Sequence, residues 1–120
     1  MDKIYLEGLE FYGYHGVLAA EQQLGQRFLV DLELKTDLRA AGVADDLNQT
    51  VNYAEVYGLV REIVEQERYA LIEALAERIA ELVLENFNIQ KVKVRVHKPQ
   101  APIPGIFRNV AVEIKREHEK

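Results

Sequence analysis

The stretch RFLVDLELKTDLR, residues 27–39, decides how this chain folds. Five of its apolar side chains fall on even-numbered positions and face one way, at Phe28, Val30, Leu32, Leu34 and Leu38. The polar side chains between them face the other way, at Asp31, Glu33, Lys35, Asp37 and Arg39. A period of two is typical of a strand with one face in the core and one in water. The stretch therefore predicts a half-buried antiparallel strand.

Three other stretches predict strands of the same kind, at residues 3–13, 91–98 and 108–117. In the first of them, Ile4 and Leu6 should share one face, while Tyr5, Glu7 and Leu9 share the other. The last two place alternate apolar residues on the inner face, at Val92, Val94, Val96, Val110, Val112 and Ile114. These patterns predict four strands in total.

Two helices are predicted between the second and third strands. Asn52 has the character of an N-cap, with Glu55 three residues later, as in a variant of the capping box. The first helix then carries a stripe of Val56, Leu59, Val60, Ile63 and Val64. After a break at 67–70, the second carries Ile72, Leu75, Ala76, Ile79, Leu82, Val83 and Phe87, and it ends within 86–90.

The remaining segments predict connections. Residues 15–26 should form a loop or a short helical turn, residues 40–51 a polar connection, and residues 99–105 a proline-rich loop. The order of elements is strand, strand, helix, helix, strand, strand. This order predicts the α+β class, with one four-stranded antiparallel sheet carrying two helices on its apolar face. Without a linker, residues 1–120 should form a single domain.

Composition and charge exclude several classes of function. There are 15 basic and 20 acidic residues, giving a net charge of −5, and no basic block, which argues against a nucleic-acid partner. The absence of cysteine excludes disulfides, thiolate catalysis and Cys-containing zinc sites. The apolar stretch 69–87 is interrupted by charges, and the N-terminus lacks the pattern of a signal peptide. We therefore expect a cytoplasmic protein without a membrane partner.

The predicted sheet has two free edges, and free edges favour pairing with another chain. We therefore expect a homo-oligomer in which sheets join edge to edge, with closure into a ring as one form. The alternative is a monomer that its charged outer face keeps soluble.

Lys98 is the most informative candidate for chemistry. Counting by two from Val92, Val94 and Val96 places it in the register of the buried face, where the strand ends before Pro99. A lysine partly withdrawn from water can serve as a general acid or base. The alternative is a lysine that extends its ammonium group into solvent.

Other candidates each have a structural alternative. Glu73, in the first turn of the second helix, could bind an amidine-like group, with the amides of Leu71 and Ile72 beside it, or could simply complement the helix dipole. Tyr53 could stack on a ligand or move protons, or could pack at a helix start. Glu21 could be a solvated loop acid. The histidines at 15, 97 and 118 lack ligand spacing, so no metal site is expected.

Four strings carry a resemblance to a known family. They are Phe11-Tyr12-Gly13-Tyr14-His15-Gly16-Val17 with Glu21 downstream, Thr50-Val51-Asn52-Tyr53, Leu71-Ile72-Glu73-Ala74-Leu75-Ala76, and Lys98-Pro99 running into Pro102-Ile103-Pro104-Gly105. In this order and spacing, nearly the whole chain resembles dihydroneopterin aldolase of folate biosynthesis. The resemblance implies the tunnelling fold (T-fold), in which four subunits close a ring, two rings usually stack into an octamer, and sites lie between subunits.

The resemblance also implies a reaction. Retro-aldol cleavage of 7,8-dihydroneopterin gives 6-hydroxymethyl-7,8-dihydropterin and glycolaldehyde, with no cofactor, metal or Schiff base. An epimerase of dihydroneopterin or its triphosphate on the same fold is an alternative, and a mixed activity is expected because recombination after cleavage would epimerise the substrate. A non-catalytic ligand-binding or assembly module is the alternative from another class.

By resemblance, each candidate residue receives a role. Lys98 matches the catalytic lysine, Glu73 the carboxylate that binds the amino-pyrimidine edge of the pterin, and Glu21 a residue near the substrate side chain. Tyr53 matches a tyrosine that assists proton transfer from a neighbouring subunit. Further ring contacts would come from Val51, Asn52, Leu71 and Ile72. Asn52 departs from the family pattern, since many bacterial members carry histidine there.

Overall fold

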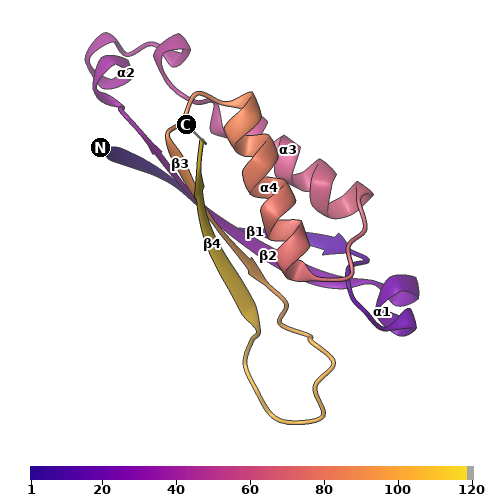
Figure 1. The fold of residues 1–120 in the computed structure, drawn as a ribbon. Coiled ribbons are helices and arrows are strands. Elements are labelled where there is room, and N and C mark those ends of the chain that lie inside the picture. The colour runs from indigo at the N-terminus through magenta and orange to yellow at the C-terminus, as the bar shows by residue number, and fades with distance from the viewer. Residues whose placement is uncertain (119–120) are drawn as a thin grey trace.

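A four-stranded antiparallel sheet in the order β1-β2-β3-β4 forms one layer of the protein, and helices form the other (Figure 1). The computed structural model describes residues 1–118. Its strands are β1 (Asp2–Gly13), β2 (Gln26–Thr36), β3 (Lys91–His97) and β4 (Ala111–Glu117). Its main helices are α3 (Tyr53–Gln66) and α4 (Ile72–Asn86). The predicted α+β architecture is therefore confirmed, with β1 and β4 at the edges of the sheet.

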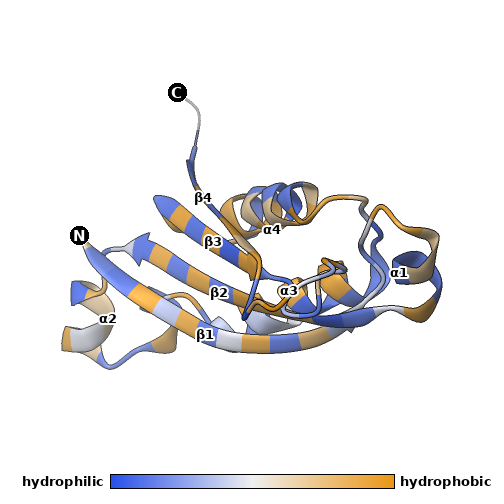
Figure 2. Ribbon diagram, turned by 90° about the horizontal axis from the view of Figure 1, so that it is seen from below, coloured by the Kyte–Doolittle hydropathy of each residue, from blue (hydrophilic) through white to orange (hydrophobic). Residues whose placement is uncertain are grey.

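The predicted alternation in β2 builds the centre of the core. Phe28, Val30, Leu32 and Leu34 are buried, and each intervening side chain is more exposed. Figure 2 shows the resulting alternation of hydrophobic and hydrophilic residues along β1, β2 and β3. Helix α3 packs on β1, and α4 packs on β3 and β4, so both cover the same face. Their buried stripes match the predicted helical spacing.

The predicted N-cap is confirmed at the start of α3. The side-chain oxygen of Asn52 accepts a hydrogen bond from the Ala54 backbone N–H at 3.0 Å. This bond satisfies one of the backbone donors that a helix start leaves open. Residue types alone were therefore enough to predict where α3 begins.

The predicted faces of β1 are wrong beyond Leu6. The pairing of β1 with β2 shifts between Leu6 and Leu9, so that Leu9 lies opposite Val30 on the core face. Gly8 occupies the shift with a φ of 69°, and its N–H donates to the Asp31 carboxylate at 2.7 Å. Because a β-bulge inserts an extra residue, it reverses the side-chain alternation after it.

The structure refines the predicted connections and one strand boundary. The expected polar connection at 40–51 contains α2 (Arg39–Ala44) and a single 3₁₀ turn, η1 (Leu47–Gln49). The short helical turn expected within 15–26 is present as α1 (Ala19–Leu24). Strand β4 begins at Ala111 rather than 108, although Lys98 still donates a backbone bond to Val110 at 2.7 Å. The β3–β4 ladder therefore extends as far as Lys98.

Candidate active site

Lys98, which is partly buried, and Glu21, which is buried, form an ion pair at one end of the sheet. The Lys98 ammonium nitrogen lies 2.5 Å from Oε2 of Glu21, with side-chain exposures of 14% and 8%. Lys98 directly follows β3, as its register predicted, and Glu21 comes from α1. Opposite charges withdrawn from water interact more strongly than the same pair at the surface. The two residues are therefore held as a unit, rather than as a solvated lysine and a loop acid.

Glu21 is held by further hydrogen bonds. The Leu18 backbone N–H donates to Oε1 at 3.3 Å, and Nε2 of Gln26 donates to Oε2 at 2.8 Å. Burial alone would raise the pKa of Glu21, but the bonds from Lys98, Gln26 and Leu18 outweigh burial and lower it. The carboxylate is consequently ionised at neutral pH.

Gly16 makes room for the Glu21 side chain. A Cβ atom at position 16 would lie 2.4 Å from the carboxyl carbon of Glu21, closer than real contacts allow. Glycine is therefore required here by close approach, which gives the His15-Gly16 pair of the sequence a physical reason.

His15 has a role that sequence analysis missed, because it was weighed only as a metal ligand. The side chain is fully buried; Nε2 donates to the Val64 carbonyl at 2.8 Å and Nδ1 accepts from the Tyr69 N–H at 3.1 Å. Burial lowers the pKa of His15, and this bonding pattern needs the neutral ring. Together with the bond from Gly16 N–H to the Tyr69 carbonyl at 3.0 Å, His15 fixes the segment that leads into α4.

The start of α4 lies at the same end of the molecule as α1 (Figure 1). Leu71 is its N-cap residue and provides no side-chain cap, while Glu73 is exposed in the first turn. Ile72 is buried and anchors the turn in the core. An uncapped helix start with an adjacent carboxylate offers both donors and an acceptor to a ligand.

Val51, Asn52 and Tyr53 lie elsewhere. They precede or begin α3, which runs antiparallel to α4, so they stand at the opposite end of the helix pair (Figure 1). A helix of this length, 14 residues, spans about 20 Å. Tyr53 is 65% exposed, whereas Val51 is buried. A single chain therefore pairs Lys98 with Glu21 and places the start of α4 at the same end of the molecule, with Tyr53 at the other end.

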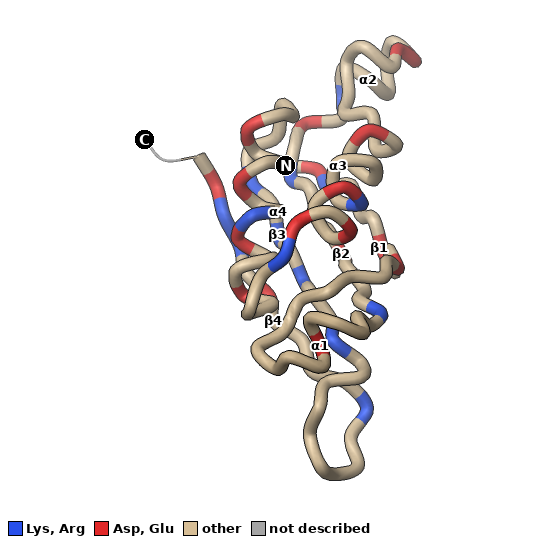
Figure 3. Tube along the Cα trace, turned by 90° about the vertical axis from the view of Figure 1, so that its right-hand side faces the viewer, with Lys and Arg blue, Asp and Glu red and all other residues tan. Residues whose placement is uncertain are grey.

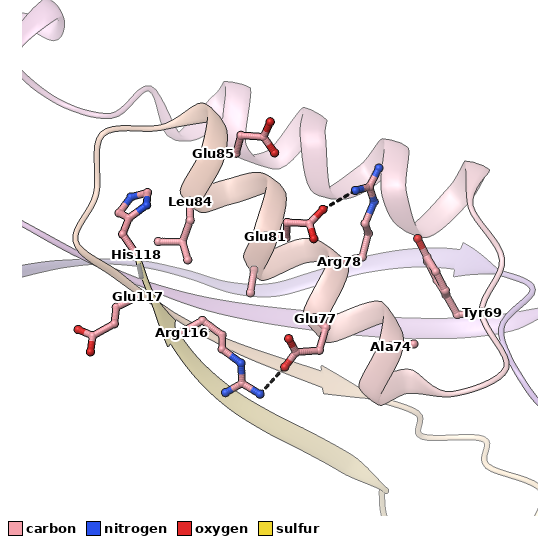
Figure 4. Close-up of a pocket in the computed structure, with 11 residues that line it drawn as sticks. Tyr69, Ala74, Glu77, Arg78, Glu81, Leu84, Glu85, Arg116, Glu117 and His118 are labelled. Atoms are coloured by element: carbon pink, nitrogen blue, oxygen red, sulfur yellow. Dashed lines mark hydrogen bonds and ion pairs between the residues drawn. The ribbon is translucent and has the colours of Figure 1, made fainter. Parts of the chain in front are cut away.

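A hollow with a volume of about 1050 Å³ lies between α4 and β4 (Figure 4). Its lining includes Glu77, Arg78, Glu81 and Arg116, and contains none of the predicted site residues. These charges satisfy one another, since Arg116 pairs with Glu77 and Arg78 pairs with Glu81 at 2.7 Å. Within residues 1–118, no group of three or more His, Cys, Asp or Glu is arranged to hold a metal ion.

Comparison with solved structures first defines the fold class. A uricase from Bacillus fastidious superposes with a TM-score of 0.66 at 9% identity, over 98% of this chain and 44% of that chain. At such low identity the likeness concerns the fold alone, and it identifies the T-fold. E. coli dihydroneopterin aldolase in complex with neopterin superposes with a TM-score of 0.90 at 36% identity, over 97% of this chain and 99% of that chain.

Sequence comparison then defines the family. The family model described as FolB, dihydroneopterin aldolase, matches residues 4–115. A dihydroneopterin aldolase from Bacillus subtilis is 56% identical over 118 residues, which cover 98% of each chain. This chain therefore belongs to the dihydroneopterin aldolase family.

The buried neutral His15 predicts a specific dependence of stability on pH. Because its folded pKa lies below the unfolded value of about 6.5, its contribution is complete above that pH and is lost as pH falls toward the folded pKa. The free energy of unfolding should drop by up to about 1.4 kcal/mol per pH unit through this window. Urea denaturation between pH 7.5 and 5.5 measures it.

Two substitutions separate His15 from the other histidines. His15→Gln should weaken the dependence, because glutamine does not titrate, whereas His118→Gln, at an exposed position near the end of β4, should retain it. An equal drop in the native protein and in the His15→Gln protein would contradict the assignment.

Proposed function

We propose that Lys98, paired with Glu21, moves the protons in retro-aldol cleavage of 7,8-dihydroneopterin. The chain has dihydroneopterin aldolase activity, a lyase reaction of folate biosynthesis, as its family membership establishes. The observation that supports these residue roles is the buried contact of 2.5 Å between the Lys98 amine and the Glu21 carboxylate. A lysine held in this way provides a proton donor and acceptor at a fixed position.

The chemistry needs little more than proton transfer. Removal of the proton from the hydroxyl on the second side-chain carbon forms a carbonyl, and the bond between the first and second side-chain carbons breaks. Its electrons enter the adjacent ring C=N bond, glycolaldehyde leaves, and a proton is returned to the first carbon. Because the substrate supplies its own electron sink, we propose that the reaction uses no metal, cofactor or Schiff base.

The start of α4 is proposed to hold the pterin ring. Glu73 would accept hydrogen bonds from the amino-pyrimidine edge, in the paired geometry that carboxylates form with amidine-like groups. The open backbone groups near Leu71 and Ile72 would add contacts to the ring. This arrangement places binding and chemistry on separate elements, so that they can be altered independently.

A second copy of the chain is proposed to complete the site. Tyr53, Asn52 and Val51 stand at the far end of the helix pair, and the sheet edges β1 and β4 each have one neighbour in the chain. Pairing of β1 with β4 of another copy would extend the sheet and close a ring. In a tetrameric ring, or an octamer of two rings, Tyr53 of one subunit would meet Lys98 of the next.

The other proposed properties follow from charge and patterning. The charged residues of β3 are basic, those of α4 are mainly acidic, and β4 carries both signs, so that opposite charges lie on neighbouring elements (Figure 3). With the net charge of −5, this supports a small-molecule pterin substrate and a cytoplasmic location, without nucleic-acid or membrane partners. Among the described residues, no helix is long and apolar enough to cross a membrane.

The direct experiment incubates the purified protein with dihydroneopterin or its triphosphate, without added metal, and separates the products. We expect glycolaldehyde and 6-hydroxymethyl-7,8-dihydropterin from dihydroneopterin, unchanged after exhaustive chelation. Epimers without glycolaldehyde would favour the epimerase, and binding without turnover would favour a non-catalytic module. Activity that disappeared on chelation and returned with a divalent ion would contradict the proposed mechanism.

Lys98→Ala should separate chemistry from binding. Loss of the proton carrier should reduce turnover by about 10²–10⁴, the usual contribution of general acid–base catalysis, while pterin affinity at Glu73 is retained. Single-turnover rates and calorimetric titration with neopterin measure the two quantities. Lys35→Ala, on β2, is the control and should keep native turnover. Equal losses of rate and affinity would make Lys98 a binding residue instead.

A shared site predicts complementation between two inactive variants. In Lys98→Ala and Tyr53→Ala proteins every site lacks one residue. When the two variants assemble together in equal amounts, roughly a quarter of the sites should contain both Lys98 and Tyr53. This follows because each site takes Lys98 from one chain and Tyr53 from another, at random. Light scattering should give a mass of four or eight chains. A monomer, or mixed assemblies without regained activity, would contradict the intersubunit site.

A further inference from the structure

Gln26 breaks the pattern of the strand that it begins. It is the first residue of β2 and lies in the core register with Phe28 and Val30, yet it carries an amide at only 8% exposure. At the other end of β2 and on the same face, Thr36 is also 8% exposed. Apolar side chains fill the four positions between them on this face. An amide at such a position needs partners, because burial of an unpaired polar group destabilises the fold.

The amide of Gln26 has only part of its hydrogen bonding satisfied. Nε2 donates to Oε2 of Glu21 at 2.8 Å, the same oxygen that contacts the Lys98 amine at 2.5 Å. Among the described residues, Oε1 of Gln26 is the one buried side-chain nitrogen or oxygen atom without a hydrogen-bond partner. Reversal of the amide would turn Oε1 toward the carboxylate and oppose two acceptors, so the orientation of Gln26 is imposed by Glu21.

The main chain holds Gln26 and Glu21 at a fixed separation. Gly25, between α1 and β2, has a φ of 69°, and its N–H donates to the Glu21 carbonyl at 3.1 Å. A Cβ atom at position 25 would lie 2.5 Å from the ring of Tyr12 and 2.8 Å from that of Tyr14. This tight turn sets the donor of Gln26 against the carboxylate independently of any ligand.

We propose that Gln26 is a positioning residue for proton transfer, which turns the Glu21 carboxylate toward Lys98. The inference deepens the proposed function and rests on its assignment of Lys98. A methionine or leucine would fill the position without leaving an unpaired acceptor, and would suit the core register better. An amide with an unpaired oxygen, at a position where an apolar side chain would fit, is explained by the hydrogen bond that it donates to Glu21.

The effect of the Gln26 amide on the pKa of Glu21 depends on the charged groups near the Glu21 carboxylate. Lys98, after β3, is the charged group that acts on Glu21, and His15, after β1, is influenced by Lys98, Arg68 and Glu67. Loss of the Gln26 N–H removes one of the bonds that favour the ionised carboxylate, so the pKa of Glu21 should rise. It also leaves Oε2 without the donor that fixes its direction. Both effects should appear in turnover and in its dependence on pH.

Gln26→Met tests the proposal in the full-length protein. We expect kcat to fall about tenfold with KM within about twofold, and the acid limb of the kcat profile to move to higher pH. The melting temperature should change little, because removal of the unpaired buried acceptor offsets loss of the hydrogen bond to the Glu21 carboxylate. Thr36→Val is the matched control on the same strand and face; it should change stability without changing the pH profile.

Gln26→Glu provides a second, nearly isosteric variant. Its carboxyl group can donate to Glu21 only while protonated, so activity should be retained at low pH and lost as the pH rises through the pKa of the pair. This direction is opposite to that expected for Gln26→Met. The two variants together exclude a simple effect of lost volume.

Several outcomes would overturn the proposal. One is that Gln26→Met keeps the native kcat and the native pH profile. Another is that kcat and the melting temperature both fall while the pH profile stays unchanged, which would indicate that Gln26 has only a structural role. If the native protein did not cleave dihydroneopterin, the proposed function would fail separately. In that case ¹³C NMR titration of the Glu21 carboxyl group still decides, since an unchanged pKa in Gln26→Met would refute the role of Gln26.

Discussion

The buried contact between Glu21 and Lys98 is the interaction on which the site depends. Two charges withdrawn from water are stable only when each has its partner and the remaining hydrogen bonds are satisfied. Leu18, Gln26 and the close approach at Gly16 meet this condition for the carboxylate. Lys98 reaches the carboxylate because it directly follows the end of β3, in the register of the apolar face. The ion pair therefore connects α1, which carries Glu21, to the end of β3, which Lys98 follows.

The rest of the fold places this pair at the same end of the molecule as the start of α4 (Figure 1). His15 and Gly16 bind the segment around Tyr69, so the first strand fixes the entrance to the helix that carries Glu73. The antiparallel course of α3 and α4 then separates Tyr53 from these residues. One chain thus holds the proton carrier and the proposed ring-binding turn at one end. Because Tyr53 lies at the other end, we propose that a second copy of the chain supplies it.

Side-chain periodicity predicted most of the fold and the position of Lys98, because strand register depends on neighbouring residues. It failed at Leu9, since the bulge at Gly8 depends on a bond to Asp31 on another strand. The sequence could not predict the environment of Glu21 either, because its partners Gln26 and Lys98 come from β2 and from the residue after β3. His15 and Gln26 gave one weak signal each, a histidine before glycine and an amide in a core register. The family roles came from resemblance, not from physics.

Lys98 holds the Glu21 carboxylate as half of an ion pair that is largely withdrawn from water. ¹³C NMR titration of the Glu21 carboxyl group, in the native protein and in Lys98→Met, tests it most directly. We predict a native pKa below the ordinary value of about 4.3 and a clear rise when the ammonium group is removed, because only the bonds from Gln26 and Leu18 then oppose the effect of burial. The same pKa in both proteins would show that the pair does not exist in solution, and would contradict the account.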